Sequence, residues 1–203
     1  MNVDTKQAKE AKSKLPEGWR WGRLGEVCDI IAGQSPPGST YRKIPEGLPF
    51  FQGKADFGLL NPVPRVWCVE PKKVALPGDI LISVRAPVGP TNVADVKCCI
   101  GRGLAAIRCG GNSDRDFILF AIRHFESHLT EKGAGSTFEA ISRHDLEQLE
   151  IPLPPLAEQR RIAGLLKRQM AIVEKGRMAA EEELQTINAL PAALMRRAFD
   201  GEI

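Results

Sequence analysis

The first three quarters of the chain alternates short apolar runs with glycine and proline, a pattern typical of strands joined by turns. Segments rich in turn-forming residues separate the runs, at 33–43, 61–64, 86–92 and 109–114. The runs themselves predict strands over 26–32, 63–69, 79–84, 92–96 and 104–108. We expect these strands to form an irregular, mostly antiparallel sheet.

Two segments of the same region have the apolar spacing of helices. The first covers 114–131, where Ser113 is the expected N-cap and Phe117 and Phe125 share one face. The second covers 143–149, and Ser142 and Asp145 ahead of it have the spacing of a capping box. Strands mixed with short helices predict an α+β fold.

The pattern changes after the proline-rich segment IPLPPLA at 151–157, which we expect to be an extended hinge. From 157 to 190 the chain lacks proline, and apolar residues recur every seven positions. This heptad spacing predicts a long coiled-coil helix, with Pro191 kinking it or beginning a second segment. Its expected pairing face consists of Leu166, Met170, Val173, Ala180, Leu184, Ile187 and Leu194.

A helix of roughly 33 residues is about 50 Å long, too long to bury its apolar face against one domain of ordinary size. We therefore expect a partner helix, supplied by a second copy or by another chain. The resulting division is a polar leader at 1–14, a mixed domain at 15–150, the hinge at 151–157 and a helical arm at 158–203.

The formal net charge of +3 is spread unevenly. Residues 16–156 hold sixteen basic and sixteen acidic residues, so the central domain is neither a bulk polycation nor an acidic DNA mimic. Any nucleic-acid contact must therefore come from a local patch. No apolar run is long enough to cross a membrane and the leader lacks an apolar core, so we expect a cytoplasmic protein.

Residues with catalytic or metal-binding potential do not have the required spacing. Five cysteines without a CxxC pair indicate reduced, mostly buried thiols, not a zinc site or a disulfide framework. His124 and His128 are four residues apart on an expected helix but have no evident third ligand. No phosphate-binding or dinucleotide motif is present, and Val63 after Asn61-Pro62 rules out the tetrad of an adenine methyltransferase. We expect no catalytic residue, no metal and no cofactor on this chain.

Polar residues in the turn-rich loops have the chemistry needed to contact DNA. Arginine and lysine suit guanine or phosphate, glutamine and asparagine suit adenine, and aspartate can accept from cytosine. For each residue the alternative is a solvated surface position or, for the two after Gly135, a turn and cap. The candidates are Ser39, Tyr41, Arg42, Lys43, Gln52, Lys54, Asp56, Arg85, Thr91, Asn92, Arg102, Ser136 and Thr137.

Several segments, in chain order, resemble the specificity subunits of type I restriction-modification enzymes. LPEGWRWGRLGEVCDIIAGQSPP (15–37), GDILISVRAPVGPTNVA (78–94) and IGRGLAAIR (100–108) are similar to a target-recognition domain. The stretch 135–166 resembles the junction with the helical arm, and LMRRAFDGEI (194–203) resembles the end of that arm. The resemblance implies that residues 15–150 are a target-recognition domain that binds double-stranded DNA.

The resemblance also implies partners. Specificity subunits recruit methyltransferase subunits, which bind S-adenosylmethionine and methylate adenine, and can join ATP-driven restriction subunits. S-adenosylmethionine and ATP are thus expected on partner subunits, and the arm at 158–203 is expected to dock the methyltransferase.

The chain departs from the family in one respect. Family members usually carry two recognition domains and two arms, whereas this chain has one of each and no internal repeat. It is either a half-size subunit that pairs with itself or another half, which Met1 and the arm-like ending favour, or a fragment. The alternative to a DNA-reading subunit is a coiled-coil assembly adaptor without DNA specificity of its own.

Overall fold

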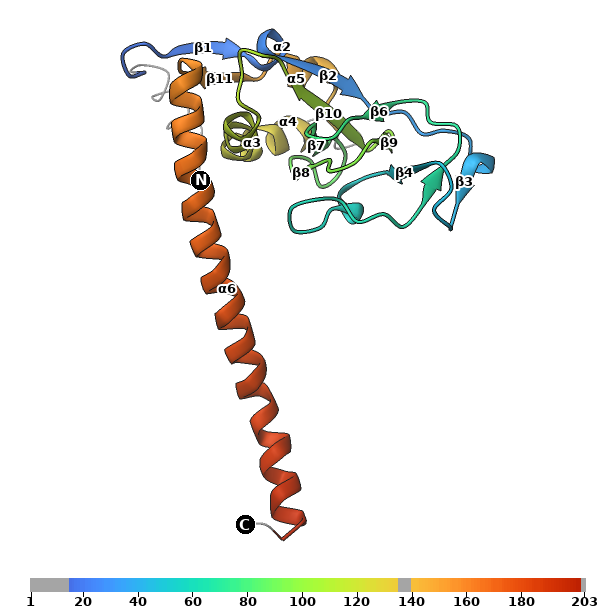
Figure 1. Cartoon of the computed structure of the whole chain (residues 1–203), viewed down its shortest axis with the longest axis vertical. Coiled ribbons are helices and arrows are strands. Elements are labelled where there is room, and N and C mark those ends of the chain that lie inside the picture. The colour runs from blue at the N-terminus through green and yellow to red at the C-terminus, as the bar shows by residue number, and fades with distance from the viewer. Residues whose placement is uncertain (1–14, 135–139, 202–203) are drawn as a thin grey trace. The chain divides into compact units, whose positions relative to one another are not determined.

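The computed structural model describes residues 15–134 and 140–201, and the chain divides into two compact units, Met1–Arg160 and Arg161–Ile203 (Figure 1). The first unit combines short strands with short helices, and the second consists of a long helix. The predicted α+β class and the long C-terminal helix are confirmed.

The strands of the first unit form three small sheets. One pairs β1 (Arg20–Arg23) with β11 (Glu150–Leu153). The next has the order β2 (Cys28–Ala32), β10 (Leu104–Cys109), β7 (Ile80–Ser83) and β8 (Thr91–Val93). The last has the order β3 (Tyr41–Arg42), β5 (Trp67–Cys68), β4 (Leu48–Phe51), β9 (Cys98–Ile100) and β6 (Val74–Ala75).

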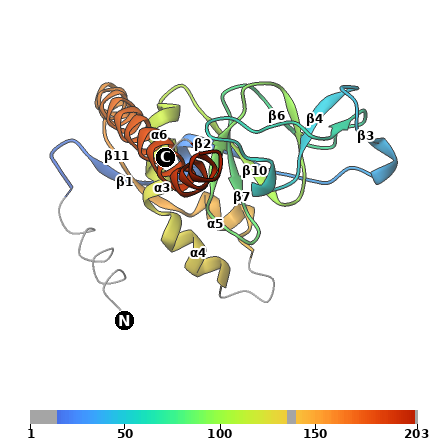
Figure 2. The same cartoon turned by 90° about the horizontal axis from the view of Figure 1, so that it is seen from below.

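The pairing is mostly antiparallel, as predicted, and among the described strands β4 and β9 form the one parallel pair. In both views β3, β4 and β6 lie at the end of the domain opposite to β1 and β11 (Figures 1 and 2). The core joins the two larger sheets, because Phe51 and Ile100 from one pack with Leu81 and Leu104 from the other. All four residues of β7 are buried, which explains the apolar run of its first three residues, Ile80 to Ile82.

The helices of this unit are short, and one sequence prediction about them is wrong. The expected helix over 114–131 is two helices, α3 (Arg115–His124) and α4 (Glu126–Ala134), separated at Phe125. Asp114, and not Ser113, caps α3, because its carboxylate accepts a hydrogen bond from the Phe117 backbone nitrogen. Ser113 instead donates to the Val27 carbonyl oxygen at 2.9 Å.

Two further helical turns flank the strands. The capping box of Ser142 and Asp145 is confirmed at the start of α5 (Arg143–Glu147). The strand expected from residue 26 begins two residues later, since α2 (Leu24–Val27) precedes β2.

The expected hinge at 151–157 is a structured part of the domain. Its first half is β11, which pairs antiparallel with β1 so that Pro152 lies opposite Trp21. Pro154 and Pro155 follow the strand, and the last two residues already belong to α6 (Leu156–Phe199). Proline is tolerated here because both strands of a two-stranded sheet are edge strands. On an edge strand the backbone nitrogen can face away from the partner strand, where the sheet does not need it as a hydrogen-bond donor.

The second unit contains the rest of α6, which continues through Pro191 to Phe199 without starting a new segment. Arg177 forms ion pairs with Glu174 and Glu181, three and four residues away along the helix. These pairs support helix formation on an exposed face. Neither this helix nor another described one is apolar over a stretch long enough for a bilayer crossing.

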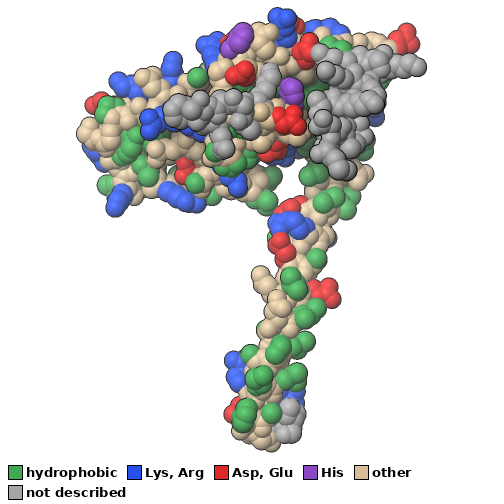
Figure 3. All heavy atoms as spheres, turned by 180° about the vertical axis from the view of Figure 1, so that it is seen from behind, with side chains coloured by type: hydrophobic (Ala, Val, Ile, Leu, Met, Phe, Trp, Pro, Cys, Tyr) green, Lys and Arg blue, Asp and Glu red, His purple; other side chains and the backbone are tan. Residues whose placement is uncertain are grey.

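Apolar side chains recur along the exposed part of α6 (Figure 3). Of the predicted pairing face, Leu166 is half-buried and Ala180 is exposed. More than half of the surface of the other five is exposed: Met170, Val173, Leu184, Ile187 and Leu194. The sequence prediction missed a flanking row of exposed apolar residues at Leu165, Ile172 and Leu190.

Candidate nucleic-acid interface

A groove of about 300 Å³ brings together residues that lie far apart in the sequence. Five of the residues predicted to contact DNA contribute to it: Tyr41, Gln52, Lys54, Arg85 and Arg102. Ser35, Gly53, Ser83, Ala86 and Gly103 complete the lining.

A tight turn at residues 101–103 builds the centre of the groove. The Gly101 nitrogen donates to the Phe51 carbonyl oxygen at 2.8 Å, which attaches the turn to the end of β4. On the other side the Val84 nitrogen donates to the Gly103 carbonyl oxygen at 3.0 Å, which attaches it to the end of β7. Arg102 is therefore held between the segment that carries Gln52 and the segment that carries Arg85.

Glycine is required at this turn because backbones approach closely. A Cβ atom on Gly103 would lie 2.2 Å from the Gln52 carbonyl oxygen, a distance that no real side chain allows. Gly33 meets the turn from the other side, where a Cβ atom would lie 2.1 Å from the Gly101 carbonyl oxygen. The glycines thus fix the position of Arg102 relative to Gln52.

Three cations line the groove, and none of its ten lining residues is acidic. Lys54 begins the 3-10 helix η3 (Lys54–Asp56), and Lys54, Arg85 and Arg102 are all exposed. No residue in the described parts of the chain forms an ion pair with these three side chains. The groove therefore presents uncompensated positive charge, which attracts a polyanion.

Gln52 is the neutral polar side chain best placed for reading bases. Its backbone nitrogen donates to the Asp56 carboxylate at 2.7 Å, which fixes the loop, while its own side chain is exposed. An exposed amide can donate and accept together, as recognition of adenine requires. The carboxylate of Asp56, which was also predicted to contact DNA, therefore accepts a hydrogen bond within the loop.

Tyr41 contributes to the wall of the groove. Its hydroxyl donates to the Pro36 carbonyl oxygen at 3.0 Å, and its ring packs against Phe50 with centroids 4.8 Å apart. Burial is the main reason why the pKa of its hydroxyl is raised.

Other predicted residues do not line this groove. Arg42 pairs with Glu46 at 3.2 Å and donates to the Ser39 carbonyl oxygen. Thr91 accepts a hydrogen bond from the Arg123 side chain at 2.9 Å. Lys43 is exposed outside the groove lining. Ser136 and Thr137 lie outside the described residues.

The prediction that Asn92 contacts DNA is wrong. Only 2% of its surface is exposed, and its side-chain nitrogen donates to the Gly58 carbonyl oxygen at 2.9 Å. Its side chain cannot contact DNA in this structure, because it attaches the 58–61 loop to the edge strand β8. Asn61 makes the reciprocal bond, from its side chain to the Val93 carbonyl oxygen at 2.9 Å.

Sequence reasoning missed Ser35 and Ser83 as groove residues. The Ser35 hydroxyl oxygen accepts a hydrogen bond from the Arg102 backbone nitrogen at 3.3 Å. Ser83 is buried at the end of β7 and donates to the Arg85 carbonyl oxygen at 3.0 Å. The turn-rich composition of 33–43 was a signal for Ser35, whereas nothing in the sequence marked Ser83.

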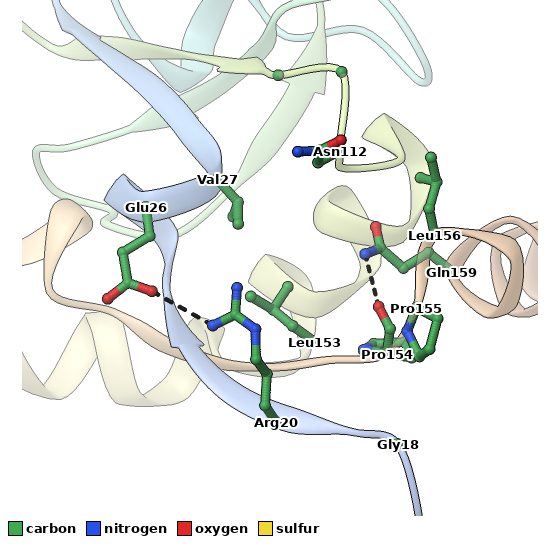
Figure 4. Close-up of a pocket in the computed structure, with 12 residues that line it drawn as sticks. Gly18, Arg20, Glu26, Val27, Asn112, Leu153, Pro154, Pro155, Leu156 and Gln159 are labelled. Carbon is green, nitrogen blue, oxygen red and sulfur yellow. Dashed lines mark hydrogen bonds and ion pairs between the residues drawn. The ribbon is translucent and has the colours of Figure 1, made fainter.

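A second, larger cavity of about 540 Å³ has different chemistry (Figure 4). Its cation, Arg20, points toward Glu26, and the two form an ion pair at 3.5 Å. The proline segment and Gln159 line the opposite side, with the Gln159 side-chain nitrogen donating to the Pro154 carbonyl oxygen. Because its charges are balanced, this cavity attracts a polyanion less strongly than the groove around Arg102.

Comparison with known proteins places these features in a family. Residues 16–180 match the model of the type I restriction modification DNA specificity domain. The chain is 44% identical over 193 residues to the specificity subunit assigned to type I restriction enzyme MjaX of Methanocaldococcus jannaschii. The aligned region covers 94% of this chain and 44% of the relative.

Solved structures agree with the sequence matches. A chain from work on complex assembly and conformational transition of the type I restriction-modification system has a TM-score of 0.81 and 50% identity, covering 98% of this chain and 51% of that one. The HsdS subunit of Thermoanaerobacter tengcongensis has a TM-score of 0.73 and 51% identity over 85% of this chain and 45% of its own. The chain thus spans about half the length of these relatives.

Proposed function

The chain belongs to the type I restriction-modification DNA specificity family, and on that premise we propose that it supplies DNA sequence recognition to such an enzyme. The observation that carries the proposal is the convergence of Lys54, Arg85 and Arg102 with the exposed amide of Gln52 on one groove. In this role the chain binds double-stranded DNA and neither methylates nor cuts it.

The groove residues divide into two roles by their chemistry. Lysine and arginine contact phosphates and hold the domain in register on the duplex, and arginine can also contact guanine through two hydrogen bonds. Gln52 reads a base edge, with adenine as the base that matches its donor and acceptor. The three cations in a groove lining that contains no acidic residue support the first role, and exposure of the Gln52 side chain supports the second.

The helical arm gives the chain its partners in this proposal. The exposed apolar residues of α6 repeat with heptad spacing, which suits pairing with a second arm from another copy or another half-size subunit. The arm also docks methyltransferase subunits, which carry S-adenosylmethionine, and through them restriction subunits that use ATP. A chain with one recognition domain and one arm then reads one half of a bipartite DNA site.

The test is to map methylated adenines in cells that express a type I methyltransferase subunit with and without this chain. We expect methylation at a split motif only when both are present, with inverted-repeat halves if the chain pairs with itself. Replacing Gln52 and Arg102 by alanine should relax or abolish the motif. Lys97→Ala, which removes an exposed lysine outside the groove, is the matched control.

Other outcomes distinguish the alternatives. A chain that joins the methyltransferase but leaves its DNA preference unchanged is an assembly adaptor. Methylation or cleavage by the purified chain alone contradicts a non-catalytic role, and a continuous motif contradicts reading by paired half-subunits.

A further inference from the structure

Two cysteines far apart in the sequence face each other across neighbouring strands. In the antiparallel register of β2 and β10, Cys28 lies directly opposite Cys109. Their sulfur atoms are 3.6 Å apart. Directly opposed residues of an antiparallel pair have Cα atoms about 4.5–5.5 Å apart, within the range of about 4.4–6.8 Å that a disulfide spans. Rotation of the two side chains is therefore enough to bring the sulfurs into bonding distance.

The other three cysteines are fully buried, and two of them have strongly raised pKa values. Cys68, Cys98 and Cys99 have no exposed surface. Burial raises the pKa of the Cys98 thiol to about 12 and that of the Cys99 thiol to about 11. These thiols remain protonated at neutral pH, and a protonated thiol is a poor nucleophile.

The Cys28 and Cys109 thiols share a hydrogen bond that shifts their pKa values in opposite directions. The hydrogen bond with Cys109 is the largest cause of the lowered pKa of the Cys28 thiol, and Ser113 lowers it further. The same bond is the largest cause of the raised pKa of the Cys109 thiol, followed by burial. Cys109 is partly exposed at the end of β10, whereas 5% of Cys28 is exposed. A small oxidant can reach the pair from the Cys109 side.

We propose that Cys28 and Cys109 are an oxidation site, where a peroxide converts the facing thiols into a reversible intramolecular disulfide. The Cys28 thiolate attacks one peroxide oxygen and becomes a sulfenic acid, and the other oxygen leaves as hydroxide, which takes up a proton to become water. The Cys109 thiol then attacks the Cys28 sulfur, the S–S bond forms and a second water leaves. Two electrons pass from the thiols to the peroxide, and a dithiol reductant reverses the change by thiol exchange.

The position of the pair determines what the disulfide does. The five predicted residues of the groove, from Tyr41 to Arg102, all lie between Cys28 and Cys109 in the sequence. The bond therefore closes this whole segment into a loop, which restricts the unfolded chain. In the folded protein it joins strands that are already paired, so the groove keeps its shape. Oxidation should stabilise the recognition domain without preventing DNA binding.

The experiment treats the purified full chain with hydrogen peroxide and maps disulfides by mass spectrometry of a non-reduced digest. We expect five free thiols to fall to three, with the peptides of Cys28 and Cys109 joined and the change reversed by dithiothreitol. The melting temperature should rise on the order of 10 °C. DNA affinity, measured with the methyltransferase partner present, should change less than about twofold.

Variants separate this pair from the other thiols. Cys109→Ala should form no intramolecular disulfide and show no rise in melting temperature, whereas Cys68→Ala should keep both. The wild-type map decides the matter even if a variant fails to fold. Retention of all five thiols, a disulfide at Cys68 and Cys99, or oxidation of Cys28 without a bond to Cys109 each overturns the proposal.

Discussion

The side-chain oxygen of Gln159 accepts a hydrogen bond from the backbone nitrogen of Asp114 at 2.9 Å. Asp114 is the N-cap of α3, and Gln159 lies in the first turns of α6 with 3% of its surface exposed. The Gln159 side-chain nitrogen donates to the Pro154 carbonyl oxygen at 3.0 Å (Figure 4). One buried amide thus attaches the beginning of the long helix to α3 and to the proline segment.

Replacing Gln159 by alanine should destabilise the recognition domain by about 2–4 kcal/mol, because two buried polar groups lose their partners. Gln159→Glu with its carboxyl ionised keeps the acceptor for Asp114 but has no donor for the Pro154 carbonyl oxygen, whereas the protonated carboxyl can make both bonds, so the cost of this variant should fall as the carboxyl is protonated. Denaturant unfolding of the full chain measures both. A change below about 0.5 kcal/mol for Gln159→Ala would show that water replaces the amide without cost.

Substitutions in the groove should separate phosphate contacts from base contacts. Lys54→Ala should weaken binding to all DNA sequences similarly and reduce the salt dependence of affinity by about one unit. Gln52→Ala should cost about 1–3 kcal/mol at one base pair and relax the preference there. Binding titrations on matched and mismatched duplexes at several salt concentrations measure both. Unchanged affinity and specificity in both folded variants would remove this groove from the interface.

Charge on the heptad face of α6 should disrupt helix pairing. Val173→Asp with Ile187→Asp places two carboxylates where the partner helix is expected, so the chain should become monomeric while its recognition domain stays folded. Met178 is equally exposed but lies about 140° around the helix from Val173, so Met178→Asp is the control. Sedimentation and circular dichroism measure assembly and folding. Loss of assembly in Met178→Asp alone would place the interface on the other face.

Disulfide formation between Cys28 and Cys109 should depend on pH in a defined direction. The pKa of the Cys28 thiol lies below its ordinary value of 9.0, so its thiolate fraction, and with it the oxidation rate, rises with pH and reaches half its maximum below pH 9.0. Stopped peroxide reactions analysed on non-reducing gels give the rate at each pH. A rate that reaches half its maximum only at pH 9.0 or above would contradict a lowered pKa of the Cys28 thiol.

Local signals in the sequence predicted local structure well. The capping box at Ser142 and Asp145 depends on residues three apart, and its geometry is confirmed. The apolar run Ile80–Ile82 in β7 was also recognisable, since a strand buried on both faces favours consecutive apolar residues. The heptad positions of α6 follow from helix geometry alone, and the structure leaves all of those side chains exposed except Leu166, which is half-buried.

Non-local contacts account for what the sequence did not reveal. Asn92 looks like a turn residue, yet its side chain is buried because the 58–61 loop packs over β8. The proline segment looks like a free linker, yet it pairs with a strand about 130 residues earlier. For the groove, residue type suggested Gln52 and Arg102 separately, but their proximity depends on a backbone crossing at Gly103 that only the folded chain contains.

The pairing of β1 with β11 brings the two ends of the recognition domain to the same place. Arg20 lies opposite Leu153, so the chain enters and leaves the domain along one two-stranded ribbon. Everything between these strands is, in topological terms, an insertion into a short connector that leads to α6. A different recognition domain built on the same two strands would therefore reach the arm at the same place, and it would also need to supply the backbone donor that Asp114 gives to Gln159. This arrangement lets DNA preference change by exchange of one continuous segment of the gene.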